Sequence, residues 1–303
     1  MSSITAYGSD YFGECEFPLL IGRSMSHPPP LNPDTSPPHP HDLTTEEHHH
    51  DFCELVIVNK GIGLQNLEGL DMPITVGDVF LLQGQQRHYF HQRQNLEIIN
   101  VMYNPEQIKL PENELRQMPG YCAMFLLEPT YRKWDHFASG LHLNLEQLIE
   151  VKEIILRMEA ECSEKASGYE VVLRAKLLEL IAYLSRAYEG GKCLESKALL
   201  RLGNVIGCLD RDYQKEWKLD ELIEIAHMSK SSFLETFKKA TGHSPLNYLM
   251  QIRIQRAITL MRQPELNITE IAYSVGFNDS NYFTRQFRKL TGKTPREYRQ
   301  KSL

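Results

Sequence analysis

The stretch FLETFKKATGHSPLNYL, residues 233–249, returns in altered form fifty residues later as FTRQFRKLTGKTPREYR, residues 283–299. Each copy places two phenylalanines one helical turn apart and follows the second with two basic residues. This spacing predicts a helix that buries both rings. Gly242 and Gly292 suit the left-handed position that ends a helix, and the Ser-Pro or Thr-Pro that follows suits the start of another.

A shorter helix is expected upstream of each copy, in LDELIEIAHM (219–228) and NITEIAYSVGF (267–277). A helix, a tight turn and a second helix with polar residues on its exposed face form a helix-turn-helix, whose second helix enters a major groove. A long helix over 245–262 would join the two units, so that they reach successive groove segments about 34 Å apart. The alternative, a helical repeat for protein contacts, normally needs three or more units.

The charge distribution supports a polyanion as partner of the C-terminal third. Residues 190–303 contain 19 Lys or Arg and 12 Asp or Glu, whereas residues 1–189 contain 14 and 27. The net charges are therefore +7 and −13. A basic segment attached to an acidic body favours nucleic acid binding by that segment alone, although chance surface composition explains the charge equally well.

The last hundred residues resemble the DNA-binding domain of the arabinose-regulator (AraC/XylS-type) transcription factors. The stretch IAYSVGFNDSNYFTRQFRKLTGKTPREYR, residues 271–299, carries most of this resemblance, and we assign residues 198–301 to the domain. The resemblance implies double-stranded DNA and RNA polymerase as partners.

It also implies which side chains face DNA. In the second unit, base contacts would come from Ser280, Asn281, Thr284 and Arg285, because Asn pairs with adenine and Arg with guanine. In the first unit the matching positions are Ser231, Leu234 and Glu235, and Glu235 stands where relatives often carry arginine. Phosphate contacts, which orient the protein without reading sequence, would come from Lys230, Lys238, Arg288 and Lys293.

The N-terminal two thirds predict a different architecture. Residues 28–40 contain seven of the sixteen prolines, so residues 1–45 are expected to be an extended arm. Short β-branched runs with Gly turns over 46–140 indicate a β-sandwich or barrel. Apolar residues at helical spacing then predict a hairpin of two helices within 141–189, followed by a linker at 190–197. The hairpin would cap the open face of the barrel, form a dimer interface, or do both. The fold class is thus multidomain, with a cupin-like barrel, a helical hairpin and an all-α double helix-turn-helix.

A group of polar residues stands out in the predicted barrel. His48, His50 and Glu54 have the even spacing that places them on one face of a strand, and His88 follows a later strand. The layout resembles the two motifs of the cupin barrel, although Gln83 and Gln85 stand where proline and glycine are usual. The four side chains suit either a divalent metal or a polar pocket for a hydroxylated ligand. We favour the pocket; a solvated strand entry is the third interpretation, but Glu54 inside an apolar strand needs a partner.

The stretches HHHDFCELVIVNKGIG, ITVGDVFLL and RHYFHQRQNLEIINVMY resemble the L-rhamnose-responsive regulators of the same family. This implies a sugar effector near His48, His50, Glu54 and His88, with Arg23 and the arm over the pocket, and a homodimer formed through the hairpin. We therefore expect a ligand-responsive transcription activator of carbohydrate-use genes that needs no cofactor. The alternatives are a cupin isomerase or dioxygenase fused to a DNA-binding domain, and a metal-sensing regulator of the same architecture.

The cellular location is expected to be the cytoplasm. No apolar run is long enough to span a bilayer, and the N-terminus has neither the basic start nor the apolar block of a secretory signal. The six cysteines are scattered, which is typical of reduced thiols and not of a disulfide framework or a zinc cage.

Overall fold

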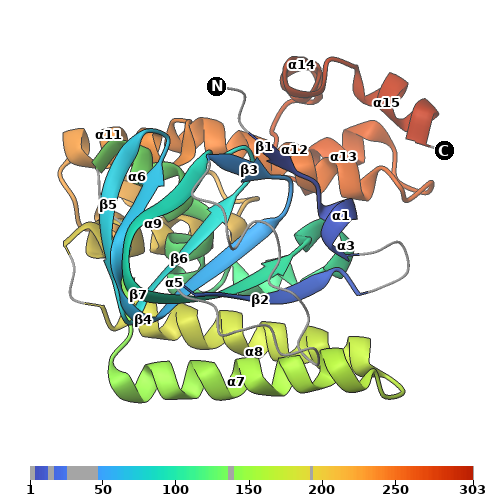
Figure 1. The fold of residues 1–303 in the computed structure, drawn as a ribbon. Coiled ribbons are helices and arrows are strands. Elements are labelled where there is room, and N and C mark those ends of the chain that lie inside the picture. The colour runs from blue at the N-terminus through green and yellow to red at the C-terminus, as the bar shows by residue number, and fades with distance from the viewer. Residues whose placement is uncertain (1–3, 13–16, 26–46, 136–139, 192–193, 303) are drawn as a thin grey trace.

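The protein folds into a bent sheet, a long helical hairpin beside it and a group of shorter C-terminal helices (Figure 1). This computed structural model describes residues 4–12, 17–25, 47–135, 140–191 and 194–302. The expected division into a sheet-rich N-terminal part and an all-helical C-terminal part is confirmed. The strands are β1 (Ile4–Ala6), β2 (Leu19–Met25), β3 (His48–His50), β4 (Cys53–Leu67), β5 (Leu70–Thr75), β6 (Asp78–Gln83), β7 (His88–Tyr103) and β8 (Leu141–His142).

The long antiparallel strands β4 and β7 form the centre of the sheet, which has the order β1-β3-β7-β4-β6-β8. β5 pairs with β4 and β2 with β7, outside this path. The described residues of the expected arm therefore belong in part to the sheet: β2 pairs with β7 along its whole length, and β1 pairs with β3. Between them lies α1 (Gly8–Phe12). The proline-rich stretch 28–40 lies outside the described residues.

The sheet bends where the register of β4 against β7 shifts, between Val58 and Leu64. Gly61 sits in this bend with φ of 75°, and a Cβ there would lie 2.2 Å from the carbonyl oxygen of Asn95. Only glycine combines that backbone angle with so close an approach. The bend curls the two long strands around an interior filled by one apolar cluster, made of Val56, Val58, Leu67, Met72, Ile74, Phe80, Leu82, Phe90, Leu96 and Ile98.

The outer face of the sheet is covered by the helical hairpin, α7 (Leu145–Glu164) and α8 (Tyr169–Glu189) (Figure 1). α7 begins with a capping box between Asn144 and Gln147. Leu145 and Ile149, which share the apolar pattern of this helix, are 73% and 49% exposed. The buried face instead uses Leu148, Val151, Ile154, Ile155 and Met158.

Helix α9 (Leu194–Arg211) joins the sheet-rich part to the C-terminal helices. It begins inside the stretch expected to be a linker, so only a few residues separate it from α8. α9 packs on a run of short helices that follows the sheet, and a Cβ at Gly203 would lie 2.4 Å from the carbonyl oxygen of Pro119. These short helices are α3 (Pro105–Ile108), α4 (Glu112–Leu115), α5 (Pro119–Tyr121), the π-helix η1 (Cys122–Leu127) and α6 (Glu128–Asp135).

An ionic cluster crosses the same joint. Asp210 of α9 accepts a hydrogen bond of 3.2 Å from Arg116, which follows α4, and lies 3.8 Å from Arg256. Arg116 also lies within 3.4 Å of the Tyr248 hydroxyl. The carboxylate of Asp210 is only 5% exposed. Burial raises the pKa of Asp210, and the positive charge of Arg116 partly offsets that effect. The joint thus buries an acid between two cations from different parts of the fold.

The C-terminal helices form two helix-turn-helix units, as the sequence predicts. The first is α10 (Leu219–Ala226) with α11 (Lys230–Thr241), and the second is α13 (Ile268–Ser274) with α14 (Ser280–Thr291). α12 (Pro245–Leu260) joins them and α15 (Pro295–Ser302) ends the chain. The repeated phenylalanines Phe233, Phe237, Phe283 and Phe287 are fully buried, and both pairs have ring centroids 5.6 Å apart.

The two units differ in what they pack against. The core of the first unit is continuous with that of the hairpin and the outer face of the sheet, whereas the second unit has a core of its own. The predicted helix ends are confirmed: Gly242 and Gly292 end α11 and α14 with φ of 75°, and Asn267 opens α13 with a capping box to Glu270.

Four cysteines, Cys53, Cys122, Cys162 and Cys208, are free thiols; Cys15 and Cys193 lie outside the described residues. No helix in the described part of the chain combines the length and the apolar character that crossing a bilayer requires.

Candidate DNA interface and effector pocket

The second recognition helix, α14, presents two of its four predicted base-contact residues fully to solvent. Asp279 caps it by accepting hydrogen bonds from the backbone amides of Asn281 and Tyr282. Asn281 and Arg285 are exposed, whereas Ser280 and Thr284 are half-buried. The Thr284 hydroxyl donates to the Ser280 carbonyl oxygen, so it can only accept a hydrogen bond from a base.

Tyr282 is a residue that the sequence analysis missed on this helix. It is 40% exposed, and the Arg285 guanidinium carbon lies 5.8 Å from the centre of its ring. The ring gives the guanidinium a stacking partner that limits its conformations. Its position three residues before Arg285 on an exposed helix face was the available signal.

The first recognition helix, α11, packs more closely against the rest of the molecule. Lys230, Ser231 and Glu235 are exposed, but Leu234 is half-buried against the shared core. Glu235 forms an ion pair of 3.1 Å with Lys239, one turn further on, which reduces its repulsion from phosphate. Lys239 was not among the predicted residues.

The difference between the two helices arises because α11 packs against α6, whereas α14 packs mainly on α12, α13 and α15. Ala240 is 2% exposed, and the matching Leu290 is 42% exposed. The two units therefore share a fold but do not offer equal surfaces.

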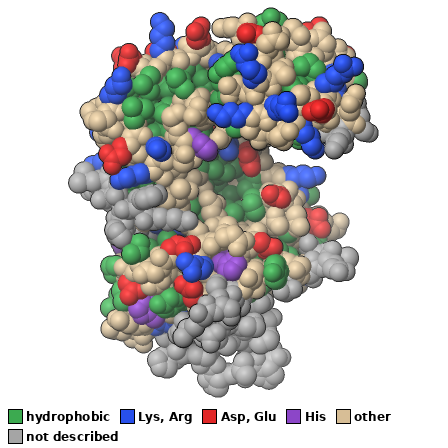
Figure 2. Space-filling model, turned by 90° about the horizontal axis from the view of Figure 1, so that it is seen from above, with side chains coloured by type: hydrophobic (Ala, Val, Ile, Leu, Met, Phe, Trp, Pro, Cys, Tyr) green, Lys and Arg blue, Asp and Glu red, His purple; other side chains and the backbone are tan. Residues whose placement is uncertain are grey.

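The predicted phosphate contacts all point to solvent. Lys230, Lys238, Arg288 and Lys293 are exposed. Figure 2 shows numerous Lys and Arg side chains on the face of the molecule that carries α14 and α15. Exposed cations near two recognition helices are the arrangement that orients a protein on a duplex.

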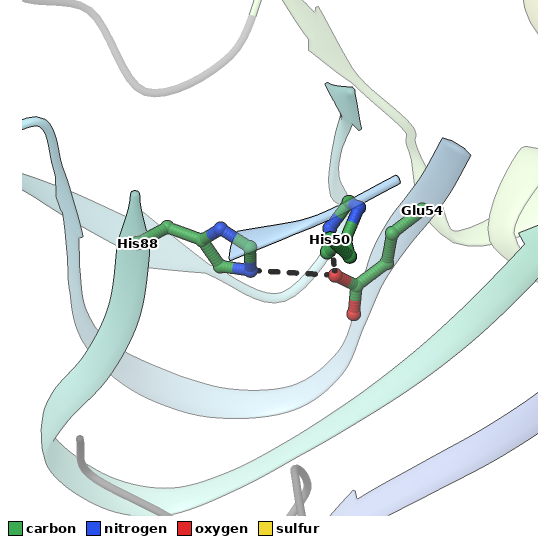
Figure 3. A group of neighbouring side chains, drawn as sticks. All are labelled: His50, Glu54 and His88. Atoms are coloured by element: carbon green, nitrogen blue, oxygen red, sulfur yellow. Dashed lines mark hydrogen bonds and ion pairs between the residues drawn. The ribbon is translucent and has the colours of Figure 1, made fainter. Parts of the chain in front are cut away.

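The strands bring the predicted polar cluster together. His48 on β3 pairs in register with His88 on β7, and the centres of their rings are 4.3 Å apart. Glu54 lies at the start of β4, with its Oε2 atom 3.1 Å from His50 Nε2 and 3.4 Å from His88 Nε2 (Figure 3). All four side chains are buried, which does not suit the third interpretation, a solvated strand entry.

The rings of His50 and His88 are held by backbone carbonyl groups. His50 Nδ1 lies 2.8 Å from the carbonyl oxygen of Phe52, and His88 Nδ1 lies 2.9 Å from that of Gln86. The Phe52 ring also stacks on His50 at 4.3 Å. Burial raises the pKa of Glu54, but the contacts with His50 and His88 outweigh it and hold that pKa well below its usual range.

Other polar groups face the same interior and were not predicted. Gln65 of β4 is fully buried, and neither its amide nitrogen nor its oxygen has a hydrogen-bond partner. Ser24, Arg93 and Asn100 line a small cavity with His48 and Glu54. Gln65 lies opposite Phe90 on β7, and the Phe90 ring lines the cavity. Side chains alternate between the two faces of a strand, so Gln65 shares the inner face with Leu67; this alternation was the available signal for an inward amide.

The cavity has a volume of about 10 Å³, room for about one water molecule. A wider hollow of about 630 Å³ lies beside it, at the edge of the sheet; it is lined by Asp51, Phe52, Cys53, Gln83–Gln86, Asn104, Pro105, Glu106, Pro129 and Thr130.

Arg23 does not join the cluster. Its side chain is exposed and makes two hydrogen bonds, of 2.8 and 2.9 Å, to the carboxylate of Glu159 on α7. The expected pocket residue instead ties β2 to the hairpin. The reason is strand alternation: Ser24, the next residue, is the one that points inward.

Known proteins resemble the chain over nearly its whole length. Residues 222–301 match the model of a helix-turn-helix domain, and residues 36–181 match the model of an AraC-like ligand-binding domain. The chain is 26% identical to the HTH-type transcriptional activator RhaR of Mannheimia succiniciproducens, over 97% of this chain and 95% of that protein. It is 29% identical to RhaR of Escherichia coli O139:H28 over 86% and 89% of the two chains, and 29% identical to the activator RhaS of Escherichia fergusonii over 84% and 87%.

Proposed function

The chain belongs to the AraC family of transcription regulators, and from that membership we propose that it activates genes of carbohydrate use when it binds a sugar such as L-rhamnose. One observation carries the proposal: a single chain joins twin helix-turn-helix units to a domain that buries Gln65, an amide without a hydrogen-bond partner. An activator must also contact RNA polymerase, and we propose that the DNA-bound form does so.

The interior suits a ligand rich in hydroxyl groups. Gln65 buries an amide with two unpaired polar atoms, and the nearby Glu54 and His88 also offer hydrogen-bonding atoms. Leaving such groups unpaired costs about 1–3 kcal/mol each, which a hydroxylated ligand would recover. A monosaccharide does not fit in about 10 Å³, so it would bind only a wider form of the domain. A ligand that prefers one form shifts the population toward it, as a sensor requires.

Thermal unfolding with a panel of monosaccharides, L-rhamnose included, tests the sugar. A ligand at a hundred times its dissociation constant should add about 2.7 kcal/mol to the free energy of unfolding. Gln65→Leu should raise the stability of the sugar-free protein, because it removes the unpaired amide, and abolish the shift. Gln94→Leu, an exposed position on β7, is the matched control and should keep it. A sugar shift that survives in Gln65→Leu would contradict this site.

A regulatory dimer is the second part of the proposal. Leu145, Ile149 and Leu156 of α7 recur at helical spacing and are 73%, 49% and 54% exposed. A helix that buries one apolar face on its own domain and exposes a second at the same spacing suits a helix–helix contact with another copy.

We expect Leu156→Arg to convert the dimer to a monomer, because a charge would be buried at the centre of the contact. Sedimentation equilibrium of the full chain measures this. Leu246→Arg, at a 45% exposed leucine on α12, is the matched control and should remain dimeric. The hairpin contact is wrong if both variants have the same mass as the wild type.

The rival function is a metalloenzyme fused to a DNA-binding domain. To distinguish the two functions, purified protein is incubated with the sugar that it binds, and formation of a product is measured. Product formation that is lost in Glu54→Gln would favour the enzyme, whereas an unchanged sugar with altered DNA binding would favour the regulator.

A further inference from the structure

The geometry points to a divalent transition-metal site formed by His50, Glu54 and His88. One possible ligand atom from each of the three lies within 4.8 Å of the other two, and all three side chains are buried (Figure 3). No other such group occurs among the residues that the structure describes. His48 packs against His88 but is not part of this group, so the site has three protein ligands and not the four that the sequence suggested.

The ring contacts decide which nitrogen of each histidine faces Glu54. A backbone carbonyl oxygen only accepts hydrogen bonds, so His50 Nδ1 and His88 Nδ1 must each carry the hydrogen that they donate to Phe52 and Gln86. In a neutral ring the other nitrogen, Nε2, then has a lone pair and no hydrogen. Both Nε2 atoms face the same carboxylate oxygen of Glu54, at 3.1 and 3.4 Å.

The three side chains bring their ligand atoms together in a buried space. His88 Nε2 has no hydrogen-bond partner and lies 3.4 Å from Glu54 Oε2. A divalent cation between the three atoms would satisfy all of them at once.

The distances agree with a metal centre. Zn²⁺ binds imidazole nitrogen and carboxylate oxygen at about 2.0–2.2 Å, so two ligand atoms on one ion lie about 2.9 Å apart at a right angle and about 3.4 Å apart in a tetrahedron. Glu54 Oε2 lies 3.1 Å from His50 Nε2 and 3.4 Å from His88 Nε2, within this range. Histidines that bind metals almost always donate their second ring N–H to a carbonyl or carboxylate, as both do here.

Two histidines and one carboxylate suit Zn²⁺, Fe²⁺, Co²⁺ or Ni²⁺ better than Mg²⁺ or Ca²⁺, which prefer oxygen. Three protein ligands leave a coordination position open, toward the cavity lined by Ser24 and Asn100. A hydroxyl group of the effector would bind at that position; this last step rests on the proposed function, whereas the metal site does not.

The test measures metal bound to the full chain. Protein stripped with a chelator and titrated with Zn²⁺ should bind one ion per chain by elemental analysis. Glu54→Gln, which keeps the shape of the side chain, should weaken binding about 100-fold or more. His142→Gln is the matched control, because His142 also lies 2.9 Å from a carboxylate, that of Asp78, but at the surface, and it should bind as the wild type does.

A second readout does not depend on any variant. Co²⁺ bound to the wild type should give visible absorption bands of a nitrogen- and oxygen-ligated site, and Zn²⁺ should remove them. The site is overturned if the wild type binds no stoichiometric Zn²⁺ or Co²⁺, or if Glu54→Gln binds as tightly as the wild type. A sugar-induced thermal shift that is unchanged in metal-free protein would overturn only the hydroxyl contact. Metal binding without response to any sugar would support the site and contradict the proposed effector.

Discussion

Replacing Asp210 by alanine is expected to lower the stability of the protein by about 3 kcal/mol, because it leaves Arg116 and Arg256 facing each other without their shared carboxylate. The value is at the low end for a broken buried ion pair, since the two guanidinium groups are 25% and 29% exposed. For a protein of this size, the melting temperature should fall by about 5 °C.

Asp212→Ala is the matched control. Asp212 pairs with Arg211 at 3.0 Å, just beyond the C-terminal end of α9, but both partners are exposed. Exposed pairs contribute about 0–1 kcal/mol, so its melting temperature should hardly change. Differential scanning calorimetry of both variants gives the comparison. Equal melting temperatures would mean that the buried cluster does not stabilise the joint.

Loss of Asp210 should also loosen the joint between the sheet-rich part and the first helix-turn-helix unit, because the cluster connects α9 and α12 to the segment after α4. Limited proteolysis should then cut between α8 and α9 faster in Asp210→Ala than in Asp212→Ala.

Arg285→Ala is expected to reduce discrimination between the preferred DNA site and random DNA by about 5- to 150-fold, which corresponds to the 1–3 kcal/mol of one base contact. Arg285 is exposed at the middle of α14 and is backed by Tyr282, so its guanidinium is free to meet a base edge. Gel-shift titrations with a site selected from a random pool measure the effect at two salt concentrations.

Lys238→Ala is the comparison variant, because Lys238 is an exposed cation near the end of α11 and is expected to contact phosphate. It should weaken binding to cognate and random DNA by the same factor. It should also reduce the slope of the logarithm of the binding constant against the logarithm of the salt concentration by about one. The assignment of Arg285 to base contact fails if its removal weakens cognate and random DNA by the same factor.

The C-terminal fold could be predicted closely because its determinants are local. Helix caps such as Asn267 with Glu270, the left-handed Gly242 and Gly292, and phenylalanines one turn apart each act within a few residues. The same local pattern returns fifty residues later, so it predicts a second unit of the same fold. The burial of Phe233 and Phe283 follows from the same spacing.

The proposed effector pocket was only partly predictable because it is made by contacts between distant strands. The even spacing of His48, His50 and Glu54 was enough to place them on one face. It did not reveal Gln65, whose buried amide lies on β4 beyond the bend at Gly61, opposite Phe90. The sequence analysis expected Arg23 over the pocket, but its neighbour Ser24 is the residue of β2 that faces inward. The pairing of β2 with β7 decides which of the two faces inward.

The sequence by itself determined the two helix-turn-helix units, the sheet before them and the candidates for base contact, because periodicity and capping act over a few residues. Tertiary structure alone decided that α11 packs on α6 while α14 stays open, that Leu145 and Ile149 face solvent, and that Asp210 meets Arg116. It also turned both histidine rings so that their Nε2 atoms meet at Glu54. These outcomes depend on which surfaces meet after the helices and strands have formed, and no short stretch of sequence contains that information.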